Sequence, residues 1–172
     1  MASRLGATPL KRSALLAAPL VVHRPRGIPA NRRNALERQP AHVIDVMPTL
    51  IDVTGASYPR EFKGQAIQPM EGVSLRPAFV GQSLRRTRPL FWEHEGNRAV
   101  RSGNWKLVST YPDDWELYDL AADRVERNNL AARHPDIVKR LAAEWNAWAE
   151  RAHVDRWPGP RSPWRASRTT SG

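Results

Sequence analysis

The sequence predicts an α+β fold, in which an antiparallel sheet of about four strands is packed by one long C-terminal helix. Residues 88–120 are dense in strand-forming residues interrupted by turn-forming residues, as in consecutive hairpins. Residues 135–154 place apolar side chains at helical spacing behind a proline. The 41% hydrophobic content and the seven Trp residues indicate a globular chain with a single modest core.

A shorter helix is expected first in the chain, beginning after Asp45. Asp45 is suited to the N-cap, and Pro48 falls in the first turn, where its missing N–H costs nothing. Gly55 is expected to end the helix. Three apolar residues share one face, which predicts that the helix packs into the core: Val46, Leu50 and Val53.

Residues 57–88 form a long irregular stretch that is rich in Gly and Pro. One short helix is expected within residues 72–80, carrying the chain across the surface to the sheet. Its expected apolar anchors are Leu75, Phe79 and Val80.

The first two strands of the sheet are joined by a tight turn. Leu90 to Trp92 begins the first strand, and Glu95-Gly96-Asn97 turns the chain. Residues 98–101 then alternate charged with apolar side chains, as a half-buried strand does. Ser102-Gly103-Asn104 makes the next turn.

The third strand, residues 105–110, carries large side chains on both faces, so we expect it to have partner strands on both sides. Lys106 is expected to be a charge at the strand edge. The run Tyr111-Pro112-Asp113-Asp114 breaks the pattern, because Pro presets φ and Asp side chains favour turns. Residues 115–120 form the last strand.

The long helix is expected from Pro135 to Val154, after a short helical turn capped by an Asn at residues 128–130. Pro135 suits the first helical position, and Asp136 complements the helix dipole. Its apolar stripe must cover a flat surface, for which the sheet is the one candidate. The stripe consists of Ile137, Leu141, Trp145, Trp148 and Ala152.

The net charge of +10 is concentrated at the two ends of the chain. Residues 1–40 hold eight Lys or Arg against one acid, residues 151–172 hold five against one, and the remainder is close to neutral. We therefore expect three parts: a basic, partly disordered segment 1–40 with one strand at 18–23, a folded subdomain 41–158, and a disordered tail 159–172.

These basic ends leave polyanion binding as a hypothesis, although a nucleic-acid-binding domain would be expected to carry its basic patch on a folded face. A secretory signal over residues 1–22 is the alternative to the strand at 18–23, but Pro19 interrupts its apolar run. No run of 18 apolar residues exists to span a membrane. The compartment, cytoplasmic or periplasmic, stays open.

Two long runs carry a family resemblance: FWEHEGNRAVRSGNWKLV and WELYDLAADRVERNNLAARHP. Together with HVIDVMPTLIDVTGASYP and GQAIQPMEGVSLRPAF, they resemble the C-terminal segment of bacterial arylsulfatases. These are formylglycine-dependent sulfuric ester hydrolases of the alkaline-phosphatase-like superfamily. The resemblance covers roughly Ala18 to Pro158. The residues of the family pattern are structural, and Trp105 and Tyr118 are expected in the core: Trp92, Trp105, Leu117, Tyr118, Asp119 and Asn129.

The resemblance does not include the catalytic half of such an enzyme. The family makes its formylglycine from the Cys or Ser of a Cys/Ser-x-Pro-x-Arg motif, and this chain has no Cys and no such motif. The nearest run, Ser57-Tyr58-Pro59-Arg60-Glu61, has Glu where Arg is needed. Formylglycine and a calcium or magnesium ion are therefore expected only in an N-terminal half, and no catalytic or metal-binding residue is assigned here. His42 and Asp45 would make half a metal site at best.

The run Glu93-His94-Glu95 is the one cluster from which a catalytic interpretation could start. In a strand, His94 faces away from both neighbours, so the three side chains cannot converge. The simpler alternative is a hairpin His hydrogen-bonded to a carboxylate. Because this hairpin approaches the substrate pocket in related sulfatases, the resemblance implies that His94, Asn97 and Arg98 line the pocket rim, where Arg98 could pair with an anionic sulfate.

The sequence thus predicts a C-terminal fragment of an arylsulfatase-like hydrolase that is inactive alone and completed by an N-terminal catalytic half. The alternative is a small non-catalytic interaction module, or a subunit that completes a split sulfatase. A sulfate ester is expected as substrate only for the completed enzyme.

Overall fold

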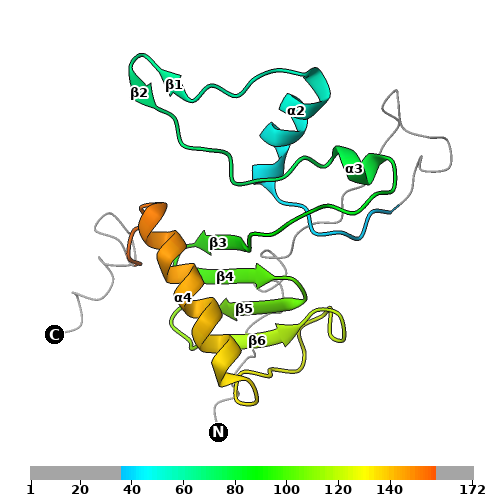
Figure 1. The fold of residues 1–172 in the computed structure, drawn as a ribbon. Coiled ribbons are helices and arrows are strands. Elements are labelled where there is room, and N and C mark those ends of the chain that lie inside the picture. The colour runs from blue at the N-terminus through cyan, green and yellow to red at the C-terminus, as the bar shows by residue number, and fades with distance from the viewer. Residues whose placement is uncertain (1–35, 158–172) are drawn as a thin grey trace, which may run out of the picture. The chain divides into compact units, whose positions relative to one another are not determined.

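The structure, a computed structural model, describes residues 36–157 (Figure 1). Within this range the chain forms two compact units, with the boundary between Arg88 and Pro89. The strand predicted at 18–23 and the tail predicted at 159–172 lie outside the described residues. No helix of the described part is long and apolar enough to cross a membrane.

The unit from Pro89 onward contains the predicted four-stranded sheet, which is confirmed. Its strands follow one another in sequence order, and each pairs antiparallel with the next (Figure 1). Tight turns join the first three, and positive φ angles at Gly96 and Gly103, of 81° and 59°, suit glycine there. The strands are β3 (Leu90–His94), β4 (Asn97–Ser102), β5 (Trp105–Ser109) and β6 (Glu116–Asp119).

One face of the sheet is covered by α4 (Pro135–Arg151), as predicted (Figure 1). The fully buried Leu141 packs among residues of the three last strands: Val100, Leu107 and Leu117. Phe91 stacks on Trp148, with ring centroids 5.2 Å apart and planes 5° from parallel. The helix ends at Arg151, three residues before the predicted end at Val154, and Ala152 is exposed rather than part of the buried stripe.

The opposite face of the sheet has its own buried cluster of Ala99, Val108, Tyr118 and Leu120, with Trp92 packed against it. Tyr118 is a core residue as expected, whereas Trp105, on the face that α4 covers, is partly buried and packs against the core there, beside His134. The predicted short helical turn is present, since the Leu130 carbonyl accepts from the amides of Arg133 and His134. There the Asn129 side chain accepts hydrogen bonds from the amides of Leu117 and Ala131.

Lys106 lies on this opposite face, and its prediction as an edge charge is wrong. Its side chain is 1% exposed, and its Nζ lies 2.7 Å from Oε1 of Glu126, whose side chain is 4% exposed. Glu126 belongs to the loop after β6 and has a φ of 57°. The strand pattern could not reveal this ion pair, because the partner comes from an irregular loop twenty positions away.

The unit ending at Arg88 contains α2 (Val46–Thr54), preceded by a 3₁₀ turn at Val43–Asp45. Gly55 ends α2 with a φ of 69°, as predicted. A hairpin that the sequence did not predict, β1 (Glu61–Phe62) and β2 (Gln65–Ala66), leads to the short α3 (Arg76–Phe79).

Of the two apolar predictions for this unit, the first is wrong and the second is confirmed in part. Val46, Leu50 and Val53 were expected in the core, but each is more than half exposed. Of the three expected anchors around α3, Leu75 is buried, Phe79 is partly buried and Val80 is 49% exposed. The residues that α2 does bury are Asp45 at its start and Pro48 in its first turn.

Candidate functional site

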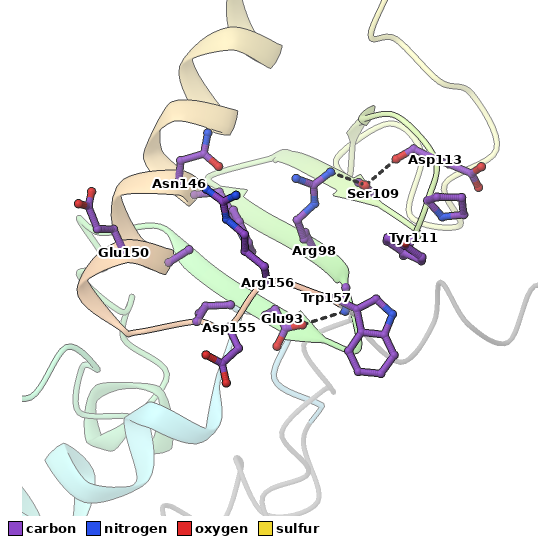
Figure 2. A pocket seen from close by; sticks show the side chains of 15 residues that line it. Glu93, Arg98, Ser109, Tyr111, Asp113, Asn146, Glu150, Asp155, Arg156 and Trp157 are labelled. Atoms are coloured by element: carbon purple, nitrogen blue, oxygen red, sulfur yellow. Dashed lines mark hydrogen bonds between the residues drawn. The ribbon is translucent and has the colours of Figure 1, made fainter. Parts of the chain in front are cut away.

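An open pocket of about 710 Å³ lies between the sheet and the C-terminal end of α4 (Figure 2). Strands β3, β4 and β5 supply one wall, and the loop after β5 supplies another. Helix α4 and the segment that follows it close the remaining side. The polar and aromatic side chains that line it are Glu93, Arg98, Ser109, Tyr111, Asp113, Trp145, Asn146, Glu150, Asp155, Arg156 and Trp157.

Cross-strand register brings three polar residues together on the pocket wall. Glu93 of β3 lies opposite Arg98 of β4, and Arg98 lies opposite Ser109 of β5. Directly opposed residues point to the same face of an antiparallel sheet. Because Val100 shares that face with Arg98 and packs against α4, the three polar side chains lie at the end of the surface that the helix covers.

The guanidinium of Arg98 is held by one hydroxyl and two indole rings. Its Nη2 donates to Ser109 Oγ at 3.0 Å, and Ser109 Oγ donates to the Asp113 carbonyl at 2.8 Å (Figure 2). The guanidinium carbon lies 4.4 Å from the ring centroid of Trp115 and 5.5 Å from that of Trp145. Partial burial lowers the pKa of Arg98 below its usual value.

No carboxylate of residues 36–157 forms an ion pair with Arg98. Its cross-strand neighbour Glu93 instead accepts a hydrogen bond from the Gly96 amide at 2.9 Å and so closes the hairpin turn. A guanidinium has five N–H donors, and Arg98 uses one of them in a hydrogen bond to the described residues. The arrangement leaves a partly desolvated cation with unused donors in an open pocket, which favours an anionic or hydroxyl-rich group there.

Trp157 forms the outer wall of the pocket because the hairpin turn has no side chain at Gly96. A Cβ at Gly96 would lie 2.6 Å from Cδ1 of Trp157, so any larger residue would displace the indole. The φ of 81° at Gly96 also disfavours other residue types.

Only one of the three residues predicted to line a pocket rim lines this pocket. Arg98 does so, whereas His94 and Asn97 are not among the lining residues. His94 is exposed, and Asn97 joins two loops by donating to the His94 carbonyl at 2.8 Å and accepting from the Tyr111 amide at 3.0 Å. Glu93 and His94 do not converge, as the strand alternation predicted.

Sequence reasoning missed most of the pocket. The place of Ser109 in the pocket could have been inferred from the strand pattern, because Ser109 shares a face with Leu107 and lies opposite Arg98. The place of Trp157 could not have been inferred, because the segment after α4 has no periodic pattern. Trp115 was expected in the last strand, and Trp145 in the apolar stripe of the long helix. That both rings contact Arg98 is visible only in the folded chain.

The described residues do not fit a metal ion. No group of three or more His, Asp or Glu side chains in residues 36–157 could hold one. The pair singled out in the sequence is occupied otherwise: Asp45 is fully buried and bonded to Arg86, and His42 Nδ1 accepts from the Ile44 amide. Burial lowers the pKa of His42.

One family model covers most of the chain. Residues 12–150 match the model described as N-sulphoglucosamine sulphohydrolase, C-terminal. An uncharacterized sulfatase of Schizosaccharomyces pombe is 34% identical over 110 residues, which are 60% of this chain and 20% of that protein. A sulfatase of Formosa agariphila is 30% identical over 151 residues, which are 76% of this chain and 26% of that protein. The chain thus spans about a fifth to a quarter of the length of these relatives.

Solved structures agree on the fold. The chain resembles the crystal structure of Ps i-CgsB in complex with k-i-k-neocarrahexaose, with a TM-score of 0.58 and 21% identity. The match covers 74% of this chain and 27% of that one. The sheet with its covering helix is therefore an arrangement found as one part of a larger protein.

Proposed function

The chain belongs to the family described as N-sulphoglucosamine sulphohydrolase, C-terminal, and from this membership we propose that it supplies the C-terminal subdomain of a sulfuric ester hydrolase. The observation that carries the proposal is the family match, which extends from residue 12 to residue 150. The four-stranded sheet with its covering helix supports it, because the same arrangement is found within a larger solved protein.

The chain does not hydrolyse sulfate esters alone under this proposal. Its full sequence has no Cys and no Ser-x-Pro-x-Arg run from which a formylglycine nucleophile could be made. Among residues 36–157 no carboxylate and imidazole cluster is suited to a divalent cation. We expect the formylglycine and a calcium or magnesium ion to belong to a catalytic segment of the kind that the relatives have in addition.

Arg98 is the residue that we expect to face substrate in the completed enzyme. Its guanidinium is partly desolvated, has no carboxylate partner in the described residues, and is oriented by Ser109 and Trp115. A planar guanidinium suits a sulfate or carboxylate group of a substrate. His94 and Asn97 are proposed to lie further out on the same rim, with Asn97 fixing the loop that carries Tyr111.

An alternative within the same family is a separate subunit or a non-catalytic module that binds a sulfatase. The exposed apolar face of α2 favours some partner in either case. Both versions predict no activity for the chain alone, and only the completing subunit predicts activity that appears after assembly.

The test is release of sulfate from para-nitrophenyl sulfate by the purified chain, compared with the same sample after heat inactivation. The proposal predicts equal rates. Enzymatic release by the chain alone would contradict it, because the nucleophile would then have to lie within these 172 residues.

A further inference from the structure

The chain between α3 and β3 carries three arginines within four residues (Figure 1). The run Arg85-Arg86-Thr87-Arg88 ends at the boundary of the two units. It contains no helix or strand, and Arg85, Thr87 and Arg88 are exposed. Endoproteases with an acidic specificity pocket cut after Arg or Lys, and exposed irregular segments are where chains are most readily cut. The three arginines differ, however, in whether a protease could use them.

The segment that leads into this run is held along one edge by the side-chain amide of Gln39. Gln39 Nε2 donates to the Gln82 carbonyl at 3.1 Å, and the Leu84 amide donates to Gln39 Oε1 at 2.6 Å. In an extended chain, main-chain groups two residues apart point to the same edge, and those of the residues between them point to the other. The main-chain groups of Ser83 and Arg85 therefore face away from Gln39, and they form no hydrogen bond with the described residues.

A free edge of this kind is what an endoprotease needs, because an extended peptide can bind by adding to a strand of another protein. Arg85 combines the free main-chain edge with an exposed side chain. No carboxylate of the part of the chain that the structure describes forms an ion pair with it. The guanidinium of Arg85 is therefore available to an acidic specificity pocket.

The other two arginines of the run are not suited to a cut. The Arg86 side chain is 12% exposed and pairs with the fully buried Asp45, so it could enter a protease pocket only by leaving a buried carboxylate without its cation. Arg88 precedes Pro89, whose nitrogen carries no hydrogen and whose ring restricts the residue before it. The structure thus singles out the bond that follows Arg85.

We propose that the Arg85–Arg86 peptide bond is a processing site for an arginine-specific endoprotease. Hydrolysis adds one water molecule across the bond: the C–N bond breaks, Arg85 keeps the new carboxylate, and Arg86 keeps the new α-amino group. The cut interrupts no described helix or strand, because α3 ends at Phe79 and β3 begins at Leu90. It divides the chain close to the boundary of its two units. The inference does not depend on the proposed function.

The test is limited digestion of the full purified chain with an arginine-specific, trypsin-like endoprotease, followed over time by intact-mass measurement and N-terminal sequencing. The first cut between residues 39 and 150 is expected to give a fragment that begins with Arg86. Fragments that begin with Thr87 should form at least about tenfold more slowly, because the ion pair of Arg86 must open first. Cuts nearer the two ends leave both units whole and do not bear on the inference.

Two single variants assign the cut to one side chain. Arg85→Gln should slow it by about tenfold or more, since the charge that the specificity pocket recognises is lost. The matched control is Arg88→Gln, which removes another exposed arginine of the same run and should leave the rate unchanged.

A first cut elsewhere between residues 39 and 150, for example after Arg60 or Arg124, would overturn the inference. Equal rates of cutting after Arg85 and after Arg86 would overturn it too, as would a loss of the cut in Arg88→Gln. Processing also requires products that persist, so the fragment that begins with Arg86 should keep residues 89–150 at least about tenfold longer than the intact chain survives. Digestion of that fragment as fast as it forms would show degradation and contradict a processing site.

Discussion

Arg98 and Glu93 lie directly opposite each other on neighbouring strands, yet they do not form an ion pair. Glu93 accepts from the Gly96 amide, and Arg98 donates to Ser109 and packs over Trp115. The Glu93 carboxylate and the Arg98 guanidinium therefore bind different partners and not each other. The guanidinium of Arg98 is left available to a ligand in the pocket that both residues line.

Replacing Arg98 with Met should change the stability of the chain by no more than about 1 kcal/mol, because an apolar side chain keeps the packing and removes a partly desolvated charge. Urea unfolding of the variant measures this. A loss of about 3 kcal/mol or more would show that Arg98 is chiefly structural.

The same substitution should raise the KM of an assembled sulfatase for an anionic aryl sulfate by about tenfold, since a charge-assisted contact is lost. Arg98→Lys keeps the charge and loses the planar fork, and its KM should be intermediate. A KM unchanged in both variants would remove Arg98 from the substrate rim.

The buried pair of Lys106 and Glu126 should show strong coupling. Lys106→Met alone leaves a buried carboxylate without its cation and should cost about 3–5 kcal/mol of unfolding free energy. Adding Glu126→Gln removes that charge and should recover part of the loss. A double-mutant cycle by urea unfolding measures the coupling, and additive effects would show that the pair contributes little.

His42 should make the first turn before α2 sensitive to pH. Its Nδ1 accepts from the Ile44 amide, and burial lowers its pKa below 6.5, so the folded state favours the neutral ring. The unfolded chain then binds the proton more readily. Stability is fully present above pH 6.5 and falls as the pH drops toward the lowered pKa of the folded state.

NMR titration of the His42 ring checks the direction of that shift. His42→Asn, which can still accept the hydrogen bond, should remove this part of the pH dependence. A ring that titrates above the ordinary value would contradict the account.

Gly96→Ala should destabilise the hairpin by about 1–3 kcal/mol. The alanine would have to adopt the left-handed backbone conformation of Gly96, and its Cβ would displace the Trp157 ring. Trp157→Ala in the same chain should relieve the clash but not the backbone strain. Thermal unfolding of the two single variants and the double variant separates the two causes. A fully additive double variant would show that the indole does not lie against the turn.

The sheet could be predicted from sequence because each strand end has a local cause. Gly96 and Gly103 mark the turns, and the alternation from Trp105 to Ser109 assigns side chains to two faces. The long helix was equally predictable from Pro135 and its apolar stripe. Local rules of this kind need no knowledge of distant partners.

The failures share a different cause. The apolar spacing of Val46, Leu50 and Val53 correctly predicted a helix, but spacing cannot say what covers the apolar side. Asp45 and its hydrogen bonds to distant loops decided which side of α2 faces its own unit. Lys106 likewise needed Glu126, whose position depends on an irregular loop.

The pocket around Arg98 was only partly predictable. The strand pattern placed Arg98 on a hairpin, and the family resemblance suggested a rim. The two indole rings that hold the guanidinium are those of Trp115, just before β6, and Trp145, in α4. They come together only in the folded chain. Trp157 follows the helix without any pattern of its own.

The most direct measurement for the central claim is sulfate release from para-nitrophenyl sulfate by the purified chain, compared with the same sample after heat inactivation. The account predicts no release by the chain beyond that of the heated sample, because these residues contain no run from which a formylglycine nucleophile could be made. Release above that of the heated sample would contradict the claim that the chain supplies only the C-terminal subdomain of a sulfuric ester hydrolase.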